Sequence, residues 1–244
     1  MKRLNILLCT LLFTLVFFGC QGIKEENSSK SKIEPKQELK RIVVLGIDET
    51  GSYGLWEQAK SMVVRIIEQL RPGDIFYCRS ITDASYLDKY TIFRLEIPCI
   101  EEADNENPFD RKSKNLHRSQ VFQNNLLKRE ACSRLAAVRY TNAKKTDIYG
   151  FLSAASDRFN LAPKGSQRIL IVASDLKDNV GYSKIKLDLS GVQVAIIGFQ
   201  SSKDPIKTRR LKNKWIKRLT QAGAVKVVFL SVEEKLTMDL FQGA

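Results

Sequence analysis

The chain is poor in the side chains on which many metalloenzymes and hydrolases depend. Its 244 residues include one histidine, His117, and the three cysteines beyond residue 20 match no zinc-binding spacing. A Cys–His or Ser–His nucleophile needs a base within hydrogen-bond reach, and the only histidine lies in a polar stretch that we expect to be a loop. The sequence therefore argues against zinc sites and this catalytic chemistry, and we expect no enzymatic activity.

Long apolar runs are also scarce. The one conspicuous run covers residues 4–18 and is broken only by Asn5 and two threonines, which is short for a membrane-spanning helix of about 20 residues. Lys2 and Arg3 precede it, so that a positive region comes before an apolar core, as in a secretory signal peptide. We expect residues 1–19 to be such a signal.

The end of this run resembles the lipobox of bacterial lipoproteins. Gly19 and Cys20 match that motif, whereas Phe17 stands where leucine is usual. The resemblance implies that Cys20 is diacylated, becomes the new N-terminus and holds the protein on a membrane outside the cytoplasm. In a cell with two membranes, Gln21 after the cysteine resembles the outer-membrane sorting pattern. An uncleaved anchor, or ordinary cleavage with an incidental cysteine, is the alternative.

Residues 20–39 follow as a segment of Lys, Glu, Ser, Asn and Gln with almost nothing apolar. Such a segment cannot bury enough surface to order itself. We expect it to be a flexible tether between the lipidated cysteine and a domain that covers residues 40–244.

Positive charge exceeds negative charge, with 40 Lys+Arg against 27 Asp+Glu and a net charge of +13. This excess favours anionic partners such as phospholipid head groups, nucleic acid or an acidic protein. The tightest cluster is Lys207, Arg209, Arg210, Lys212, Lys214, Lys217 and Arg218. It is typical of the solvated polar face of a helix. Trp215 is the only aromatic residue among these cations, which argues against nucleic acid.

Hydrophobic periodicity predicts one α/β domain. Strands are expected at 41–47, 74–81, 168–173, 192–198 and 224–230, a half-exposed edge strand at 90–97, and a long loop at 101–118. Helices are expected at 54–70, 119–140, 147–159, 205–222 and 232–241. Apolar strands that alternate with helices imply a doubly wound, mostly parallel sheet with one antiparallel edge strand and helices on both faces.

Two cysteines, Cys78 and Cys99, lie in or near neighbouring predicted strands. An exported protein meets oxidising conditions in many bacteria, so they could form a disulfide. Buried free thiols are the alternative.

Oxygen-bearing side chains follow the predicted strands at one edge of the sheet. Asp48, Thr50 and Ser52 come directly after the first strand, Thr146 opens a helix, and Asp175 follows the fourth strand in chain order, at 168–173. Ligands of such folds bind beyond the carboxyl ends of the strands. Hydroxyl and carboxylate oxygens suit Mg²⁺, Mn²⁺ or Ca²⁺, so the sequence predicts a divalent-metal site there.

This pattern resembles the von Willebrand factor A (VWA) domain, whose metal-ion-dependent adhesion site has Asp-x-Ser-x-Ser, a later Thr and a last Asp. Asp48, Thr50 and Ser52 match the first part, with Thr in place of the first Ser, while Thr146 and Asp175 match the others. The resemblance implies that the three hydroxyls coordinate the ion and the carboxylates act directly or through waters. An open position would accept a carboxylate from a partner protein.

The sequence departs from the family at three places around this pattern. Leu176 stands where glycine is frequent, Lys145 stands where glycine is common, and the neighbouring Lys144 adds a second positive charge. These two lysines would weaken metal binding by repulsion. In the alternative without metal, Asp48 and Ser52 cap the next helix, and the aspartates at 175 and 178 are turn residues.

Taken together, the sequence predicts a membrane-anchored binding protein outside the cytoplasm that grips an acidic group of a partner protein through a divalent ion. One alternative is metal-independent binding of anionic lipid or nucleic acid by the basic segment 207–218. The other is a phosphohydrolase with Asp48 as nucleophile, as in hydrolases of the haloacid dehalogenase type. Those enzymes usually carry a second Asp where Thr50 stands here.

Overall fold

The computed structural model describes residues 40–101, 111–181, 186–199, 204–231, 234 and 237–241. The chain divides into two compact units, Met1–Gln37 and Glu38–Ala244. The predicted signal peptide, Cys20 and the tether lie outside the described residues. The second unit contains all the strands and both hydrophobic clusters described below, so a fragment of residues 38–244 carries the complete core.

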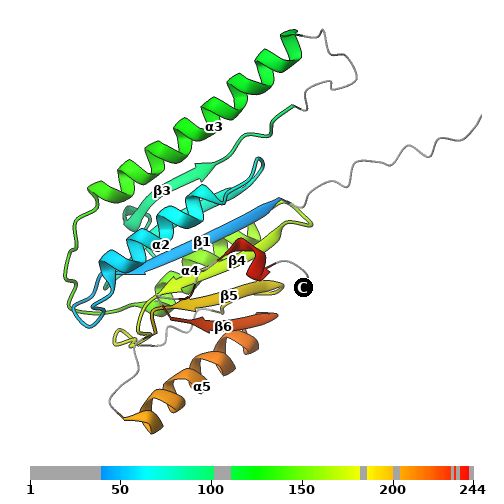
Figure 1. Cartoon of the computed structure of the whole chain (residues 1–244). Helices are drawn as coiled ribbons and strands as arrows, with labels where there is room; N and C mark the ends of the chain where they lie inside the picture. Colours follow the sequence, from blue (N-terminus) through cyan, green and yellow to red (C-terminus); the bar gives the residue numbers. More distant parts are fainter. Residues whose placement is uncertain are drawn as a thin grey trace, which may run out of the picture. The chain divides into compact units, whose positions relative to one another are not determined.

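One sheet of six strands forms the centre of the second unit, in the order β3-β2-β1-β4-β5-β6 (Figure 1). The strands are β1 Arg41–Asp48, β2 Ile75–Ile81, β3 Thr91–Glu96, β4 Gln167–Ala173, β5 Val192–Ile197 and β6 Lys226–Leu230. β3 runs antiparallel to β2 at one edge, and all other neighbouring pairs are parallel. The predicted fold class, a doubly wound, mostly parallel sheet with one antiparallel edge strand, is confirmed.

The sequence of β1 explains its central place. All eight of its residues are buried, as expected for a strand covered on both faces. Because successive side chains point to opposite faces, Val43, Leu45 and Ile47 join one hydrophobic cluster, whereas Ile42 and Val44 join the other.

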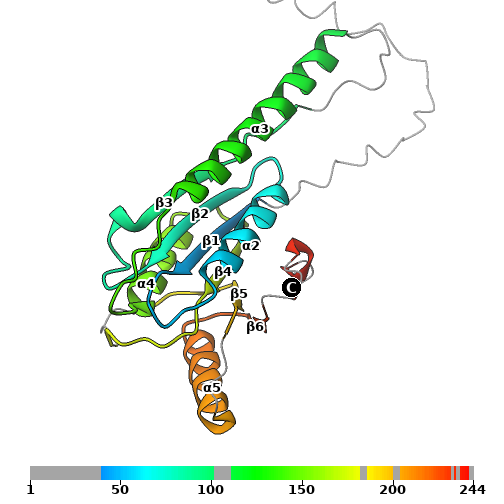
Figure 2. The same ribbon diagram turned by 60° about the vertical axis from the view of Figure 1, so that its left-hand side comes forward.

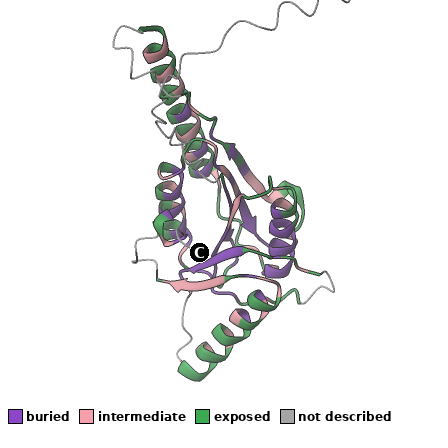
Figure 3. Cartoon of the chain, turned by 90° about the vertical axis from the view of Figure 1, so that its right-hand side faces the viewer, coloured by how far each residue is buried: buried purple, intermediate pink, exposed green. Residues whose placement is uncertain are grey.

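Helices cover both faces of the sheet (Figures 1 and 2). The elements are α2 Trp56–Glu68, α3 Arg111–Ala137, α4 Ile148–Asn160 and α5 Pro205–Gln221, with 3₁₀ turns η1 Asp88–Tyr90 and η2 Met238–Phe241. α2, α3 and η2 contribute to the first cluster, while α4 and α5 contribute to the second. In Figure 3, most of α5 and the outer part of α3 are exposed. No helix in the described part of the chain is both long and apolar enough to cross a membrane.

The predicted loop at 101–118 is wrong for residues 111–118, which form the first part of α3. This part lacks glycine and proline, which would interrupt a helix. Polar contacts attach the helix to the segment after β3, and an analysis of hydrophobic periodicity does not detect such contacts. Gln120 accepts a hydrogen bond from the backbone of Glu101 at 3.0 Å, and Asn124 donates to the carbonyl of Pro98 at 3.0 Å. His117 therefore lies in a helix, 3.1 Å from the Glu101 carbonyl.

The predicted helix at 232–241 is described only as the 3₁₀ turn Met238–Phe241, because residues 232, 233, 235 and 236 lie outside the described residues. Gln193 and Lys226 donate to backbone carbonyls of this turn, at 3.2 and 2.7 Å. The turn thereby joins β5 and β6 at their starts.

Cys78, Cys99 and Cys132 are all free thiols, so the predicted disulfide alternative is wrong. Cys78 lies opposite Phe93 in the β2–β3 ladder, whereas Cys99 comes six residues after Phe93. At roughly 3.3 Å per residue, this separation exceeds the Cα distance of about 7 Å that a disulfide can bridge. Burial raises the pKa of the Cys78 thiol, which keeps it protonated.

Gly46 lets α4 pack closely on β1, and we predict that Gly46→Ala destabilises the fold. A methyl group there would lie 2.6 Å from the Phe151 ring and 2.9 Å from Ile81. Overpacking of this kind costs about 1–3 kcal/mol, measurable by urea unfolding of residues 38–244. The double variant Gly46→Ala/Phe151→Leu should recover part of the loss. Unchanged stability in the single variant would contradict this account of the packing.

Candidate metal-ion site

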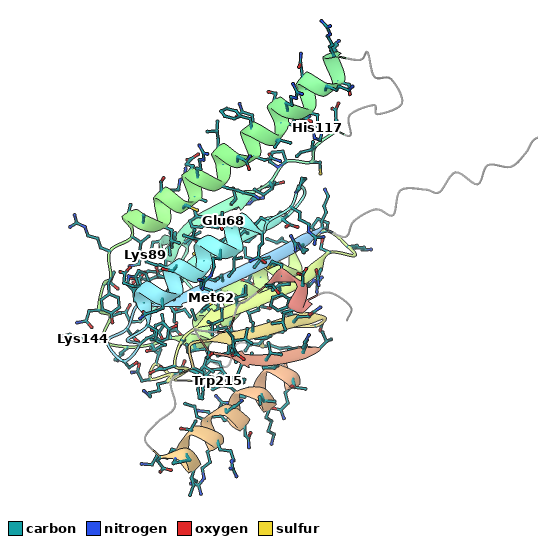
Figure 4. The ribbon with its side chains drawn as sticks, viewed as in Figure 1. Met62, Glu68, Lys89, His117, Lys144 and Trp215 are labelled. Carbon is teal, nitrogen blue, oxygen red and sulfur yellow. The ribbon has the colours of Figure 1, made fainter. Side chains whose placement is uncertain are left out.

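Three loops meet at the carboxyl edge of the sheet. β1 and β4 are neighbours, with Ile47 opposite Ala173, so the residues that follow these strands lie side by side. The loop after β1 also forms an isolated β-bridge between Thr50 and Ala143, so the segment before α4 lies beside this loop. Figure 4 shows Lys144 at this edge, whereas His117 lies far away near the start of α3.

Four predicted site residues are in contact through the hydroxyl of Thr50. Thr50 Oγ1 donates to Asp48 Oδ1 at 2.6 Å and lies 3.3 Å from Ser52 Oγ. It also accepts a hydrogen bond from Thr146 Oγ1 at 2.9 Å. Asp48, Thr50 and Thr146 are almost completely buried, whereas Ser52 is exposed. The structure thus brings one carboxylate and three hydroxyls together from two loops.

Buried polar contacts hold the loop after β1 in place. The Tyr140 hydroxyl donates to the Thr50 carbonyl at 2.6 Å, and the backbone of Ala143 donates to the Glu49 carbonyl at 3.0 Å. The buried Glu49 carboxylate accepts hydrogen bonds from Ser80 and, at 2.8 Å, from Thr141. Since each oxygen has a partner, this carboxylate acts as a structural link between loops.

The loop after β4 is locked to the segment that carries Thr146. Asn179 and Thr146 exchange hydrogen bonds, with 2.6 Å from the Thr146 backbone to Asn179 Oδ1 and 3.1 Å for the reverse bond to the Thr146 carbonyl. Asp178 accepts from the backbone of Ile148 at 2.9 Å, and Asp147 caps α4 by accepting from Gly150 at 2.7 Å. The Thr146 hydroxyl is therefore held in position from two sides.

The Asp48 carboxylate is fully buried. Its pKa is raised to about 6: burial is the largest cause, the hydrogen bonds from Ser174 and Thr50 oppose the rise, and the charge of Asp175 adds to it. The Ser174 hydroxyl donates to Asp48 Oδ2 at 2.5 Å. Among the described residues, Asp48 accepts from the hydroxyls of Thr50 and Ser174 and from the Thr50 amide, so dipoles and not a cation solvate its charge.

Asp175 is fully buried beside this cluster, but its hydrogen bonds run to its own loop. Lys177 donates to it from both its backbone, at 3.1 Å, and its ammonium group, at 2.8 Å. Ser174, the preceding residue, touches Asp48, and the charge of Asp175 acts on the pKa of Asp48. The two predicted carboxylates are therefore neighbours.

The donor set fits a hard divalent cation. With Mg–O distances of about 2.1 Å, adjacent oxygens of an octahedral shell lie about 3.0 Å apart, close to the 2.6–3.3 Å separations around Thr50 Oγ1. The Tyr53 hydroxyl is buried, has no hydrogen-bond partner among the described residues, and has its pKa raised by burial and by the charges of Asp48 and Asp175. Water carried by an ion would supply the missing partner.

No group of three His, Cys, Asp or Glu side chains suited to a metal occurs within the described ranges. An ion at this edge therefore depends on the hydroxyls of Thr50, Ser52 and Thr146 as well as on the two carboxylates.

The helix-capping alternative for Asp48 and Ser52 is wrong. α2 begins at Trp56, its N-cap is Leu55, and no side chain caps it. The turn alternative for the later aspartates describes their local geometry, because Asp175 accepts from Lys177 two residues on and Asp178 accepts from Gly181 at 2.8 Å.

Sequence reasoning missed several residues that shape the site. Ser174, Asn179 and Tyr140 bond Asp48, Thr146 and the Thr50 carbonyl, respectively. Ser174 could have been found, because it directly precedes Asp175 at the end of the same strand. The other two contacts depend on how loops far apart in the sequence fold together, and no local pattern signals them.

No known protein-family model and no curated protein matches this sequence. Solved structures of similar fold include proximal thread matrix protein 1 from the mussel byssus, with a TM-score of 0.46 and 14% identity over 78% of this chain and 43% of that chain. A von Willebrand factor type A structure from Catenulispora acidiphila has a TM-score of 0.46 and 17% identity over 79% and 38%. An aerotolerance-related membrane protein from Bacteroides fragilis has a TM-score of 0.44 and 14% identity over 80% and 92%.

This chain covers less than half the length of the first two of these structures. At these identities the likeness concerns the fold alone, and the fold class stands on the strand order and pairing of the sheet itself.

We predict that Asp48→Asn stabilises the metal-free protein at pH 7.5. The substitution keeps the size of the side chain and removes a fully buried negative charge, so the free energy of unfolding in EDTA should rise by roughly 1–3 kcal/mol. The control is Asp83→Asn, an exposed carboxylate after β2 at the same edge. That variant should change stability by less than about 0.5 kcal/mol. Loss of stability in Asp48→Asn would mean that its hydrogen bonds outweigh the cost of the buried charge.

Proposed function

We propose that this domain is a binding module that holds an acidic group of a partner protein at a divalent ion, Mg²⁺ or alternatively Mn²⁺ or Ca²⁺. The observation that supports this is the cluster of Asp48, Ser52 and Thr146 oxygens around Thr50 Oγ1. A bound ion supplies an open coordination position for a carboxylate oxygen.

The five site residues would have different roles in binding the ion. Thr50, Ser52 and Thr146 would hold the ion through their hydroxyls, while Asp48 and Asp175 supply the negative charge. Asp48 is placed by β1 and by the hydrogen bond from Ser174, so little reorganisation is required on binding.

The rim of the site favours an acidic partner. Lys144, Lys145 and Lys177 are exposed on the two loops that flank the cluster. Positive charge around a metal site attracts carboxylates and repels cationic surfaces. The basic α5 is linked to the same edge, because the Trp215 indole donates to the Leu176 carbonyl at 2.9 Å.

A catalytic role for Asp48 has little support. Its side chain is fully buried, and both its oxygens accept hydrogen bonds from Thr50 and Ser174. A nucleophile on phosphate needs a free, accessible oxygen. We therefore propose a binding function without catalysis.

The metal site predicts that Mg²⁺, Mn²⁺ or Ca²⁺ raises the thermal unfolding midpoint of residues 38–244 over its value in EDTA. An ion at 100 times its Kd should add about 2.7 kcal/mol of stability. Asp48→Ala, Asp175→Ala and Thr50→Val should lose the shift, because each removes an oxygen of the site. Asp83→Ala, which removes an exposed carboxylate at the same edge, should keep it. A midpoint unmoved by all three ions would overturn the metal-dependent function.

The membrane anchor is the second part of the proposal. The Gly19–Cys20 pair after an apolar run supports lipidation and an address outside the cytoplasm, at the outer membrane in a cell that has one. We predict that Cys20→Ser moves the full-length protein from the membrane fraction to the soluble fraction and abolishes palmitate labelling. Cys99→Ser, an exposed cysteine of the domain, is the control. Full membrane retention of the Cys20 variant would mean that another segment anchors the chain.

The second candidate function is electrostatic binding of an anionic surface by α5. This helix contains seven Lys and Arg residues and no Asp or Glu, and only Trp215 and Leu219 are buried. Binding that survives EDTA and falls steeply with salt would favour this function over the metal site. Anionic lipid is the better target, because the sequence predicts an address outside the cytoplasm for this domain.

A further inference from the structure

Both carboxylate oxygens of Asp175 are bonded by a single residue. The backbone of Lys177 donates to Oδ1 at 3.1 Å, and its ammonium group donates to Oδ2 at 2.8 Å. The Asp175 side chain is fully buried, whereas that of Lys177 is 53% exposed. The pair therefore joins a buried anion to a cation whose side chain reaches into water.

The backbone turn that brings Lys177 back onto this carboxylate is unusual. Leu176 has a φ of 59°, in the left-handed region that side-chain-bearing residues seldom adopt. The surrounding structure compensates for the strain. The Leu176 backbone donates to Ser174 Oγ at 2.9 Å, its carbonyl accepts from the Trp215 indole at 2.9 Å, and its side chain is buried. The fold thus fixes the start of the lysine side chain beside the site.

The two carboxylates of the site consequently differ in charge balance. Asp48 is surrounded by hydroxyl and amide donors, whereas Asp175 is already neutralised by the ammonium of Lys177. A divalent ion that approaches these carboxylates is attracted by Asp48 and repelled by Lys177. Since Lys177 bonds both oxygens of Asp175, an ion or an ion-bound water at Oδ2 must either share this oxygen with the ammonium or displace it.

We propose that Lys177 is an internal cation that competes with the divalent ion for Asp175, so that ion binding releases the ammonium. The inference rests on the proposed metal site and adds its regulation: Lys177 lowers the affinity for the ion. The released ammonium lies on the same rim as Lys144 and Lys145, where it can pair with an acidic group of the partner. A carboxylate of the partner then neutralises the Lys177 ammonium that the ion has displaced.

The first test is Mg²⁺ or Mn²⁺ titration of residues 38–244 by calorimetry. Lys177→Met keeps the length of the aliphatic chain and removes the charge, and it should tighten ion binding by roughly fivefold to tenfold. Lys177→Arg keeps the charge and should bind the ion no more tightly than the native chain.

The matched controls are Lys144→Met and Lys145→Met. Both lysines are exposed beside Thr146 and contribute to the same electrostatic potential, but within the described part of the chain neither forms an ion pair or hydrogen bond with Asp48 or Asp175. Each should change the affinity by less than about twofold. Equal effects of the Lys144, Lys145 and Lys177 variants would overturn the inference, because Lys177 would then act only through the net charge.

The second test measures release of the ammonium directly. Amine acylation of the native fragment followed by peptide mass spectrometry should show Lys177 slow to react in EDTA and faster with saturating Mg²⁺. Lys144 should react at the same rate in both. An unchanged Lys177 rate at saturating ion would overturn the proposed displacement.

These outcomes separate the inference from the proposed function. If the native fragment and Lys177→Met both fail to bind any ion, the metal site and the inference are both wrong. If both bind with equal affinity, the site stands and the role of Lys177 is overturned. If only Lys177→Met binds, Lys177 blocks the site in the native chain, which supports its competition for Asp175 but overturns the metal-dependent function of the native chain and the release of the ammonium.

Discussion

The burial of one carboxylate at the end of the central strand determines how the whole carboxyl edge is built. β1 is covered on both faces, so Asp48 ends the strand where water has little access. A charge there must be solvated by the protein itself. The hydroxyls of Thr50 and Ser174 do this from two loops, and Thr146 adds a third loop through Thr50. The donors of these loops therefore offset part of the cost of burying this carboxylate.

The same arrangement explains why the site is rigid at its base and adaptable at its rim. Glu49, Asn179 and Asp178 use most of their oxygens to tie loop to loop, so the buried hydroxyls have little freedom. Ser52, Lys144 and Lys177 are exposed above them. A binding site of this kind combines a preorganised floor with side chains that can adjust to a partner.

Much of the fold could be predicted because its signals are local. The buried strands are continuous apolar runs, and the apolar stripe of α2 packs on the sheet as its spacing predicts. The start of α3 could not be predicted, because polar contacts attach this helix to the segment after β3. His117 lies 3.1 Å from the Glu101 carbonyl, and Gln120 and Asn124 form hydrogen bonds to residues 19 and 26 positions earlier. The free thiols likewise follow from strand register, which the sequence alone leaves open.

The candidate site could likewise be predicted from the sequence only in part. Asp48, Thr50, Ser52, Thr146 and Asp175 stand out in the sequence because each follows or precedes a recognisable element, and the structure brings them to one edge. The contact between Lys177 and Asp175 was hidden, because it requires a left-handed conformation at Leu176 that the sequence alone would assign to glycine. Side-chain placement after such a turn depends on tertiary packing around Trp215.

The central position of β1 also has a mechanical consequence. The strand begins at Arg41, next to the segment that enters the domain, and ends at Asp48 in the candidate site. Tension between an N-terminal anchor and a held partner would therefore pass along one strand. β1 is paired in parallel with β2 on one side and β4 on the other, so the load would act in shear on two rows of hydrogen bonds at once. Under the proposed function, a pulling force would therefore enter the sheet through a strand that is buried along its whole length.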